Sequence, residues 1–229
     1  MEHLFTSTTP GFRILPCDRV LPPGAADALR GVPTPNISDS LGKLAPAGTA
    51  LKPLHRGGTM AGRAITARVP PGDNLMAYKA ILEAGPGDVV VIDAGGLVEQ
   101  ATIGEIMTTW AATRGLAGMV VHGAVRDVDV LAAADFPVYA AGFTHRGPYK
   151  DGPGELNVTV SLGGMVVAPG DLVVGDANGV VVVPYDDIGR VVAAAQAIQQ
   201  REDALVRQIQ AGGYDSAWID ETLRNRGYA

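Results

Sequence analysis

The sequence has little of what marks several classes of protein. It holds one cysteine, Cys17, so no disulfide can form within the chain, which favours a reducing compartment. No block of Lys or Arg occurs in a chain of formal net charge -6, and binding to nucleic acid needs clustered cations. No stretch approaches the ~20 apolar residues of a membrane span, and residues 1–15 lack the regions of a signal peptide. We therefore expect a cytoplasmic protein that partners neither nucleic acid nor a membrane.

Several catalytic and cofactor motifs are also missing. No Gly-x-Gly-x-x-Gly opens a helix after a strand, which disfavours a dinucleotide or methyl-donor site and hence a methyltransferase. No Gly-x-Ser-x-Gly elbow of a serine hydrolase occurs. The four histidines, at positions 3, 55, 122 and 145, have no zinc-ligand spacing.

Composition favours a single α/β domain. A length of 229 residues with 47% hydrophobic residues suits one domain with a substantial core. Aromatic residues make up only 5%, and small and β-branched residues suit tightly packed, buried strands. We expect one domain over residues 1–229, with an N-terminal arm at 1–30 and a C-terminal helical segment at 186–229.

The first third of the chain predicts short elements separated by Pro and Gly. Residues 25–29 indicate a helix within the arm. A second helix is expected to start in the segment Asn36–Leu41, with Ser38 or Asn36 as its N-cap. A strand over 61–69 is followed by a helix over 74–82 that places Leu75, Tyr78 and Ile81 or Leu82 on one face.

The middle of the chain predicts a strand–helix–strand unit. The continuous apolar run at 89–93 is typical of a strand that is buried on both faces. Thr102 and Glu105 have the spacing of a capping box, which indicates a helix starting near Ile103. Arg114 and Gly115 favour the end of that helix, and 118–121 is the next buried strand.

The last third predicts strands and then helices. Strands are expected at 136–140, 158–161, 165–167, 172–174 and 180–183, and helices at 186–211 and 215–225. Asn178-Gly179 favours a hairpin. The phrases at 86–91 and 169–174 nearly match, and we interpret both as a turn leading into a strand rather than a duplicated functional unit.

Two strand ends carry polar residues from which a site could be built. Asp93 closes the strand at 89–93, and Arg126 and Asp127 follow the strand at 118–121. Ligands of open α/β sheets bind outside the carboxyl ends of strands, where a helix N-terminus favours a carboxylate. Arg126 can grip a carboxylate or enolate oxygen, and Asp127 is a hard ligand suited to Mg²⁺ or Mn²⁺.

Arg126, Asp127 and three further polar residues could also have purely structural roles, and the sequence alone does not decide between a structural and a functional role. Arg126 and Asp127 could form a solvated ion pair. Glu105 could serve only the capping box, and Asp39 could simply support the first turn of its helix. His122 could be a hydrogen-bonded packing residue or a proton carrier.

Several short motifs together resemble one family. They are Ile37-Ser38-Asp39-Ser40-Leu41, Pro71-Gly72-Asp73-Asn74, Gly104-Glu105-Ile106-Met107, Gly123-Ala124-Val125-Arg126-Asp127, Arg146-Gly147-Pro148, Lys150-Asp151-Gly152-Pro153-Gly154-Glu155 and Gly170-Asp171-Leu172-Val173-Val174-Gly175-Asp176. Over roughly residues 30–211, the chain resembles the 4-hydroxy-4-methyl-2-oxoglutarate / 4-carboxy-4-hydroxy-2-oxoadipate aldolases, a superfamily shared with the regulator of ribonuclease activity A.

The resemblance implies a fold and an assembly. The fold is an α/β/β sandwich of the swivelling-domain type, with a buried mixed sheet and a long C-terminal helix. The chain would form a homotrimer or homohexamer with active sites between subunits.

The resemblance also implies roles for particular residues. Backbone N–H groups of Gly104, Glu105, Ile106 and Met107 would bind the carboxylate of a 2-oxo acid, and Arg126 would hold the substrate. Asp127 would bind Mg²⁺ or Mn²⁺ directly, with Glu105 and a neighbouring subunit's acid, for which Glu202 is the candidate, acting through water.

The implied reaction is C–C bond cleavage of a 4-hydroxy-2-oxo diacid through a metal-stabilised pyruvate enolate, with oxaloacetate decarboxylation by the same route. Glu105 or Asp39 would polarise the water that carries the proton. The family usually has an acid three residues after the metal-binding Asp, where this chain has Val130. If that acid only orients a loop, activity survives; if it supports the metal-binding residues, metal affinity could be lower by ~10–100-fold. The distal half of the substrate could meet Arg63, Lys79, His145 or Arg146. The alternative function is a non-catalytic regulator that binds and inhibits a ribonuclease.

Overall fold

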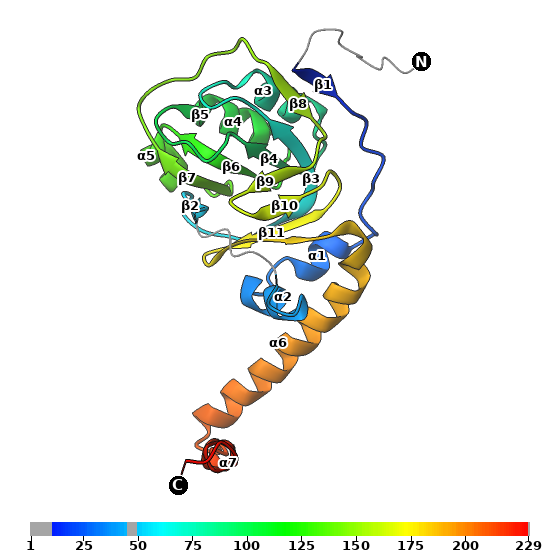
Figure 1. The fold of residues 1–229 in the computed structure, drawn as a ribbon, viewed down its shortest axis with the longest axis vertical. Helices are drawn as coiled ribbons and strands as arrows, with labels where there is room; N and C mark the ends of the chain where they lie inside the picture. Colours follow the sequence, from blue (N-terminus) through cyan, green and yellow to red (C-terminus); the bar gives the residue numbers. More distant parts are fainter. Residues whose placement is uncertain (1–10, 45–49, 229) are drawn as a thin grey trace.

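The structure, a computed structural model, describes residues 11–44 and 50–228. Figure 1 shows a body of strands and helices from which one long helix, α6, projects and carries α7 at its far end. The sheet strands are β1 (Phe12–Ile14), β2 (Lys52–Pro53), β3 (Met60–Arg68), β4 (Val89–Asp93), β5 (Ala101–Ile103), β6 (Gly118–Val125), β7 (Val138–Phe143), β8 (Gly154–Leu156), β11 (Leu172–Asp176) and β12 (Gly179–Val183), and β9 (Val160–Leu162) and β10 (Met165–Val167) form a separate pair. The helices are α1 (Ala25–Leu29), α2 (Thr34–Ser40), α3 (Leu75–Glu83), α4 (Glu105–Thr113), α5 (Val128–Ala133), the 3₁₀ turn Tyr185–Asp187, α6 (Ile188–Gln210) and α7 (Ala217–Asn225).

The sheet is mixed, as expected, and its parallel core sets the position of the site. Strands β3, β4, β6 and β7 lie side by side and parallel, so their carboxyl ends meet at one edge. Strands β8 and β11 run antiparallel to β3, and β12 runs antiparallel to β11. Strand β4 and the first four residues of β6 are continuous apolar runs, as expected of strands that are buried on both faces.

Three apolar clusters hold the layers together. Helices α3 and α4 pack on one face of the parallel strands, and the β9–β10 hairpin covers part of the other face. The third cluster lies between the β11–β12 hairpin and helices α1, α2 and α6. The inner half of α6 is thereby anchored, whereas every residue from 200 to 228 is exposed. The mixed sheet and the long C-terminal helix are both confirmed.

The two matching phrases of the sequence form the same turn, which confirms their structural interpretation. In each, the aspartate N–H donates to the carbonyl oxygen three residues earlier, from Asp88 to Gly85 and from Asp171 to Ala168. Each carboxylate then accepts the N–H of that same earlier residue, at 2.9 Å for Asp88 and 2.8 Å for Asp171. Both aspartates begin buried strands, so the repeated phrase needs no functional explanation.

Two predictions of helix capping are wrong. Helix α2 begins at Thr34 with Pro33 as its N-cap, rather than at Ser38 or Asn36, because the fixed φ of Pro33 and Pro35 favours a helix start at that point. The capping box of Thr102 and Glu105 does not form.

The predicted apolar face of α3 is only partly buried: Ile81 is buried and Tyr78 packs against the core. Helix α3 buries Met76, Ala77, Ala80 and Ile81, whereas Leu75 and Leu82 are exposed.

Within residues 11–44 and 50–228, no helix is both long and apolar enough to cross a bilayer.

Candidate functional site

The candidate site lies where β6 ends beside β5. Strand β6 runs four residues further than predicted. Its first part pairs with β4, and its last residues, Ala124 and Val125, pair with β5. The N–H of Arg126 donates to the carbonyl oxygen of Ile103 at 3.0 Å. Arg126 and Asp127 therefore lie directly beside Gly104, where α4 begins.

Asp127 adopts a backbone conformation that non-glycine residues rarely use. Its φ of 62° and ψ of 41° lie in the left-handed region, which aspartate tolerates better than most residues. Although Asp127 is the N-cap of α5, its side chain does not cap that helix. Its Oδ2 instead accepts the N–H of Glu105 at 2.9 Å and lies 3.5 Å from Nε of Arg126. The turn thus aims the carboxylate at the start of α4.

Two glycines make room for the Arg126–Asp127 pair. A Cβ on Gly104 would lie 2.4 Å from Asp127 Oδ2 and 2.8 Å from Arg126 Cγ. A Cβ on Gly147 would lie 2.9 Å from Arg126 Nη1. All three distances are shorter than real Cβ contacts, so a side chain at residue 104 or 147 would displace the guanidinium or the carboxylate.

The start of α4 offers two free donors rather than four. The N–H of Glu105 is taken by Asp127, and the N–H of Met107 donates to the carbonyl oxygen of Gly104 at 3.1 Å. Within the described residues, the N–H groups of Gly104 and Ile106 have no acceptor. A helix N-terminus with free N–H groups favours an anion, and Arg126 adds a full positive charge beside it.

A cavity of about 240 Å³ opens beside these donors. It lies between the starts of α3 and α4 and the segment 147–150, and its size suits a small acid better than a drug-sized ligand. Its lining residues are Asn74, Tyr78, Ile103, Gly104, Ile106, Met107, Arg126, Gly147, Pro148 and Lys150. The lining therefore contains two cations and no carboxylate.

The donor set at this site fits a hard divalent cation. The side chains of Arg126 and Asp127 are 39% and 35% exposed, so the Asp127 carboxylate is open to an ion from solvent. Glu105 lies exposed in the first turn of α4, next to Asp127. In the described part of the chain, no three or more His, Cys, Asp or Glu side chains gather to form a cage. In proteins, Mg²⁺ often binds only one or two carboxylates and keeps several of its waters. Asp127 and Glu105 could supply those carboxylates.

Two predicted residues lie away from this site within the chain. Asp39 lies in the last turn of α2, not the first, and pairs with Lys43 at 3.8 Å. Glu202 on α6 accepts a hydrogen bond of 2.8 Å from Nδ2 of Asn36 on α2. Helices α2 and α6 pack against each other below β11, whereas α4 and α5 lie on the upper part of the body (Figure 1).

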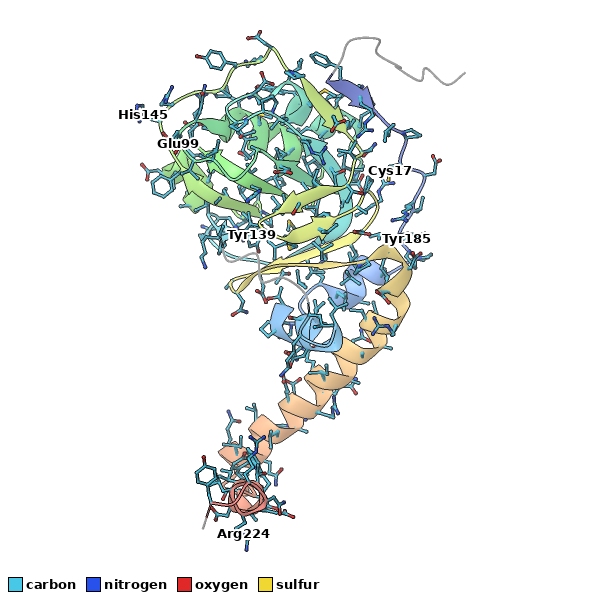
Figure 2. All side chains as sticks on the ribbon, in the orientation of Figure 1. Cys17, Glu99, Tyr139, His145, Tyr185 and Arg224 are labelled. Atoms are coloured by element: carbon cyan, nitrogen blue, oxygen red, sulfur yellow. The ribbon has the colours of Figure 1, made fainter. Side chains whose placement is uncertain are left out.

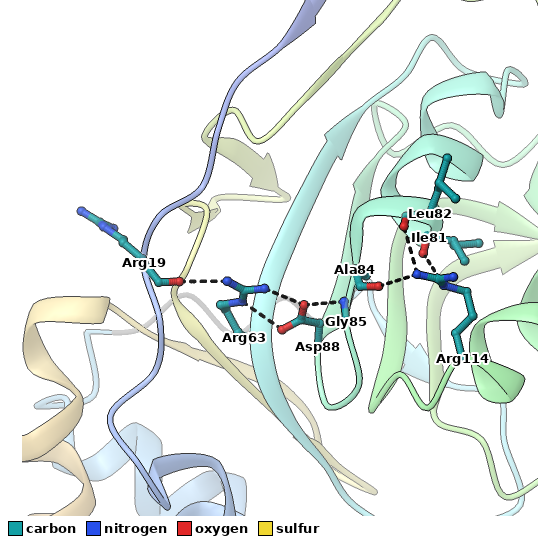
Figure 3. A network of polar contacts seen from close by, with 8 residues as sticks. All are labelled: Arg19, Arg63, Ile81, Leu82, Ala84, Gly85, Asp88 and Arg114. Carbon is teal, nitrogen blue, oxygen red and sulfur yellow. Dashed lines mark hydrogen bonds and ion pairs between the residues drawn. The ribbon is translucent and has the colours of Figure 1, made fainter. Parts of the chain in front are cut away.

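Two of the four residues suggested for the distal half of the substrate have structural roles. Arg63 donates from Nε and Nη2 to the Asp88 carboxylate at 2.9 and 2.7 Å (Figure 3). Asp88 directly precedes β4, so this pair lies at the amino end of that strand, whereas the site lies at the carboxyl end of β6. This pairing raises the pKa of Arg63. Lys79 pairs with Glu83 on α3. Neither Arg63 nor Lys79 lines the cavity.

The other two residues, His145 and Arg146, follow β7. His145 lies at the outer edge of the body (Figure 2), and the carbonyl oxygen of Arg146 accepts the N–H of Ala101 at 2.9 Å. Neither lines the cavity.

His122 is largely buried and makes a polar contact with Asp93, which leaves both of its interpretations open. Its Nδ1 lies 3.4 Å from Asp93 Oδ1, and a Cβ on Gly96 would lie 2.8 Å from its Nε2.

Sequence reasoning missed the second wall of the cavity. Asn74 and Lys150 both line it, yet they were noted only as parts of family motifs. Their signal was present in those motifs, but pairing between segments about 75 residues apart cannot be seen from local patterns.

The fold and the site define an α/β protein with an anion-binding helix start beside an Arg–Asp pair, and comparison with known proteins assigns its family. The model of the RraA-like family, described as Aldolase/RraA, matches residues 34–182. The chain belongs to this family, as its motifs indicated.

Similar proteins support this assignment. A protein of Halalkalibacterium halodurans named "Putative 4-hydroxy-4-methyl-2-oxoglutarate aldolase" is 42% identical over 180 residues, covering 79% of this chain and 86% of that protein. The structure of RraAS2 of Streptomyces coelicolor, described as an unusual member of the RNase ES inhibitor RraA family, matches with a TM-score of 0.73 and 27% identity, over 82% of this chain and 98% of the other. The RNA-processing inhibitor RraA from Thermus thermophilis matches with a TM-score of 0.61 and 33% identity, over 66% of this chain and 92% of the other. The similarity to named aldolases supports an enzyme of the lyase type.

Proposed function

We propose that this protein is a divalent-metal-dependent lyase that cleaves a C–C bond of 4-hydroxy-2-oxo diacids and releases pyruvate. The observation that carries the proposal is the Asp127 carboxylate, aimed by a left-handed turn at the start of α4 beside Arg126. The name of the relative that is 42% identical supports the same reaction class.

The residues of the site would hold the pyruvate half of the substrate. The free N–H groups of Gly104 and Ile106 would bind its carboxylate, and Arg126 would bind the oxygen that becomes the enolate oxygen. Asp127 would hold Mg²⁺ or Mn²⁺, which when bound supplies Lewis-acid stabilisation of the developing negative charge. No lysine Schiff base is required, because the charge is stabilised electrostatically.

The reaction needs two proton transfers: the substrate loses one proton to a base, and the enolate gains one. The hydroxyl on carbon 4 gives its proton to a base as the bond between carbons 3 and 4 breaks, which yields a carbonyl product and the enolate of pyruvate. Protonation of the enolate carbon then gives pyruvate. Glu105 is free of the capping box and exposed in the first turn of α4, so it could hold the water that moves these protons.

Oxaloacetate would be decarboxylated at the same site. Loss of CO₂ from oxaloacetate leaves the same pyruvate enolate, so Arg126 and the amides of α4 would stabilise it in the same way.

The site would be completed between subunits of a homotrimer or homohexamer. Asp39 and Glu202 lie on the packed helices α2 and α6, away from Arg126 of their own chain, so they would serve the site of another copy. Residues 200–228, which we call the C-terminal arm, support this assembly because they expose Leu205, Val206, Ile209, Tyr214, Trp218, Ile219, Leu223 and Tyr228. Arg224 lies at the far end of this arm, well away from the sheet (Figure 2). Apolar surface of this extent indicates a partner, and a second copy would cover it.

The direct test is a coupled assay of pyruvate release with Mg²⁺ or Mn²⁺. It is run on 4-hydroxy-4-methyl-2-oxoglutarate, 4-carboxy-4-hydroxy-2-oxoadipate and oxaloacetate. We expect release that a chelator abolishes and that falls by at least about 100-fold in Asp127→Asn. Release that survives both treatments would refute the metal-dependent proposal.

A second candidate function is a non-catalytic regulator that binds and inhibits a ribonuclease. It is favoured by the 33% identity to the RNA-processing inhibitor RraA from Thermus thermophilis. A regulator of this kind would release no pyruvate under any metal condition.

A further inference from the structure

We infer that Lys150 binds the second carboxylate of the substrate and so selects diacids at this site. The inference rests on the proposed function, because it assigns the half of the substrate that extends beyond the pyruvate unit.

The charge of the cavity favours a ligand with two negative groups. Arg126 and Lys150 line it, and among residues 11–44 and 50–228 no acidic residue does. This is unusual in a chain with 18 Lys and Arg against 24 Asp and Glu. The pyruvate carboxylate and enolate oxygen would bind to Arg126 and the amides of α4, which leaves Lys150, the other cation of the lining, without an anion.

Lys150 is available to bind an anion. No ion pair of Lys150 occurs among the described residues, and its Nζ lies 5.5 Å from the centre of the Tyr78 ring. By contrast, Lys79 on the same side of the molecule is already paired with Glu83. The Tyr78 ring, which also lines the cavity, directs the ammonium group while leaving its three N–H donors free.

The backbone on both sides of Lys150 is fixed. Tyr149 donates to Gly72 O at 2.7 Å and accepts from Asn74 N at 3.0 Å. The buried carboxylate of Asp73 accepts the N–H groups of Asp151 and Gly152 at 2.8 and 2.9 Å. Its other oxygen accepts the N–H of Leu75 at 2.9 Å, which ties the segment to the start of α3. Asp73 is thus a positioning residue for Lys150, and the ammonium group projects from a rigid segment.

A second observation points to a polar ligand in the same cavity. Asn74 lines it, is only 2% exposed, and its Oδ1 has no hydrogen-bond partner within the described residues. Its Nδ2 donates to Thr102 O at 3.1 Å, which fixes the amide. A buried carbonyl oxygen without a donor costs free energy. A polar ligand in the cavity, or a water bound with it, would supply that donor.

The test compares a diacid with a monoacid. Pyruvate release is measured with Mg²⁺ on 4-hydroxy-4-methyl-2-oxoglutarate and on 4-hydroxy-2-oxopentanoate, which has no second carboxylate. The proteins are the full chain, Lys150→Met, Lys150→Arg, and Lys79→Met as the matched control. Exchange of the methyl protons of pyruvate in heavy water provides a second reference that involves no distal group.

We expect Lys150→Met to lower kcat/KM for the diacid by about 10- to 100-fold relative to both references, mainly through KM. Lys150→Arg should regain most of this loss because it keeps the charge, and Lys79→Met should behave as the unaltered chain. An equal loss on diacid cleavage and on pyruvate exchange, or no loss on the diacid, would overturn the inference. Absence of pyruvate release and of exchange in the unaltered chain would instead reject the proposed function, and with it this inference.

Discussion

At the scale of single residues, the proposed site depends on three polar groups that lie close together. The Asp127 carboxylate, the Arg126 guanidinium and the Glu105 N–H lie close together at the end of β6. They fit there because Gly104 has no side chain. The sequence placed Arg126 and Asp127 at a strand end correctly. It could not show that Asp127 would replace the capping box, because the contact joins residues 22 positions apart.

Gly104→Ala should remove activity without unfolding the protein. The φ of Gly104 is −160°, which any residue adopts, so the substitution acts through the new Cβ and its 2.4 Å approach to Asp127 Oδ2. Displacing the carboxylate and Arg126 should lower the rate of pyruvate release by about 100-fold. The matched control is Gly189→Ala on α6, where a Cβ would have nothing within 4 Å. Equal activities of the two variants would contradict this reading of the site.

At the scale of elements, one carboxylate joins α2 to the β11–β12 hairpin. Asp176 accepts the N–H of Thr34 at 2.9 Å and its hydroxyl at 2.8 Å, and also the N–H of Asn178 at 2.7 Å. Burial pushes the pKa of Asp176 up, but these hydrogen bonds outweigh it and hold the pKa below its ordinary value.

Asp176→Asn should destabilise the protein at neutral pH and much less in acid. The pKa of Asp176 is lower in the folded chain, so its contribution is present above about pH 4, the unfolded pKa, and is lost as pH falls through the folded pKa. We expect a loss of about 1–3 kcal/mol in the free energy of unfolding at pH 7. Urea unfolding at fixed protein concentration, at pH 7 and near pH 3, measures it.

The control for this comparison is Asp203→Asn, since Asp203 is exposed on α6 and has no hydrogen bond or ion pair within the described residues. Burial raises the pKa of Asp171, so this residue changes the stability with pH in the opposite sense to Asp176. It is present in every protein compared, so its effect cancels. A destabilisation by Asp176→Asn that is equal at both pH values would exclude the ionic contribution.

The elements could be predicted where the local sequence marks them, by an apolar run, by helix-favouring residues or by a long periodic pattern. Strand β4 and helices α1 and α6 match the predicted ranges to within two residues. Strands β1, β5 and β8 have three residues each and exist because a distant strand pairs with them, so no local pattern indicated them. For the same reason, the second wall of the cavity, including Lys150, could not be placed from the sequence.

At the scale of the whole molecule, the projecting C-terminal arm is the feature that bears on the proposed assembly. It carries Glu202 away from the site of its own chain and exposes eight large apolar side chains. If each site joins two copies, variants that are inactive for different reasons should complement each other.

Mixing Asp127→Ala with Glu202→Ala should restore activity. When the two inactive proteins are unfolded together and refolded at equal amounts, about one quarter of the inter-subunit sites should combine two unaltered halves. Pyruvate release should therefore recover to about a quarter of that of the unaltered protein. A mixture with only the average activity of the two variants would place the whole site within one chain.

The central claim is that the Arg126–Asp127 site stabilises the enolate of pyruvate, and proton exchange measures that step without any need to know the natural substrate. The protein is incubated with pyruvate and Mg²⁺ in heavy water, and loss of the methyl proton signal is followed by NMR. The account predicts exchange that a chelator abolishes and that falls by at least about 100-fold in both Arg126→Ala and Asp127→Ala. Exchange at the rate of the uncatalysed reaction in the unaltered protein, or exchange that both variants retain, would contradict it.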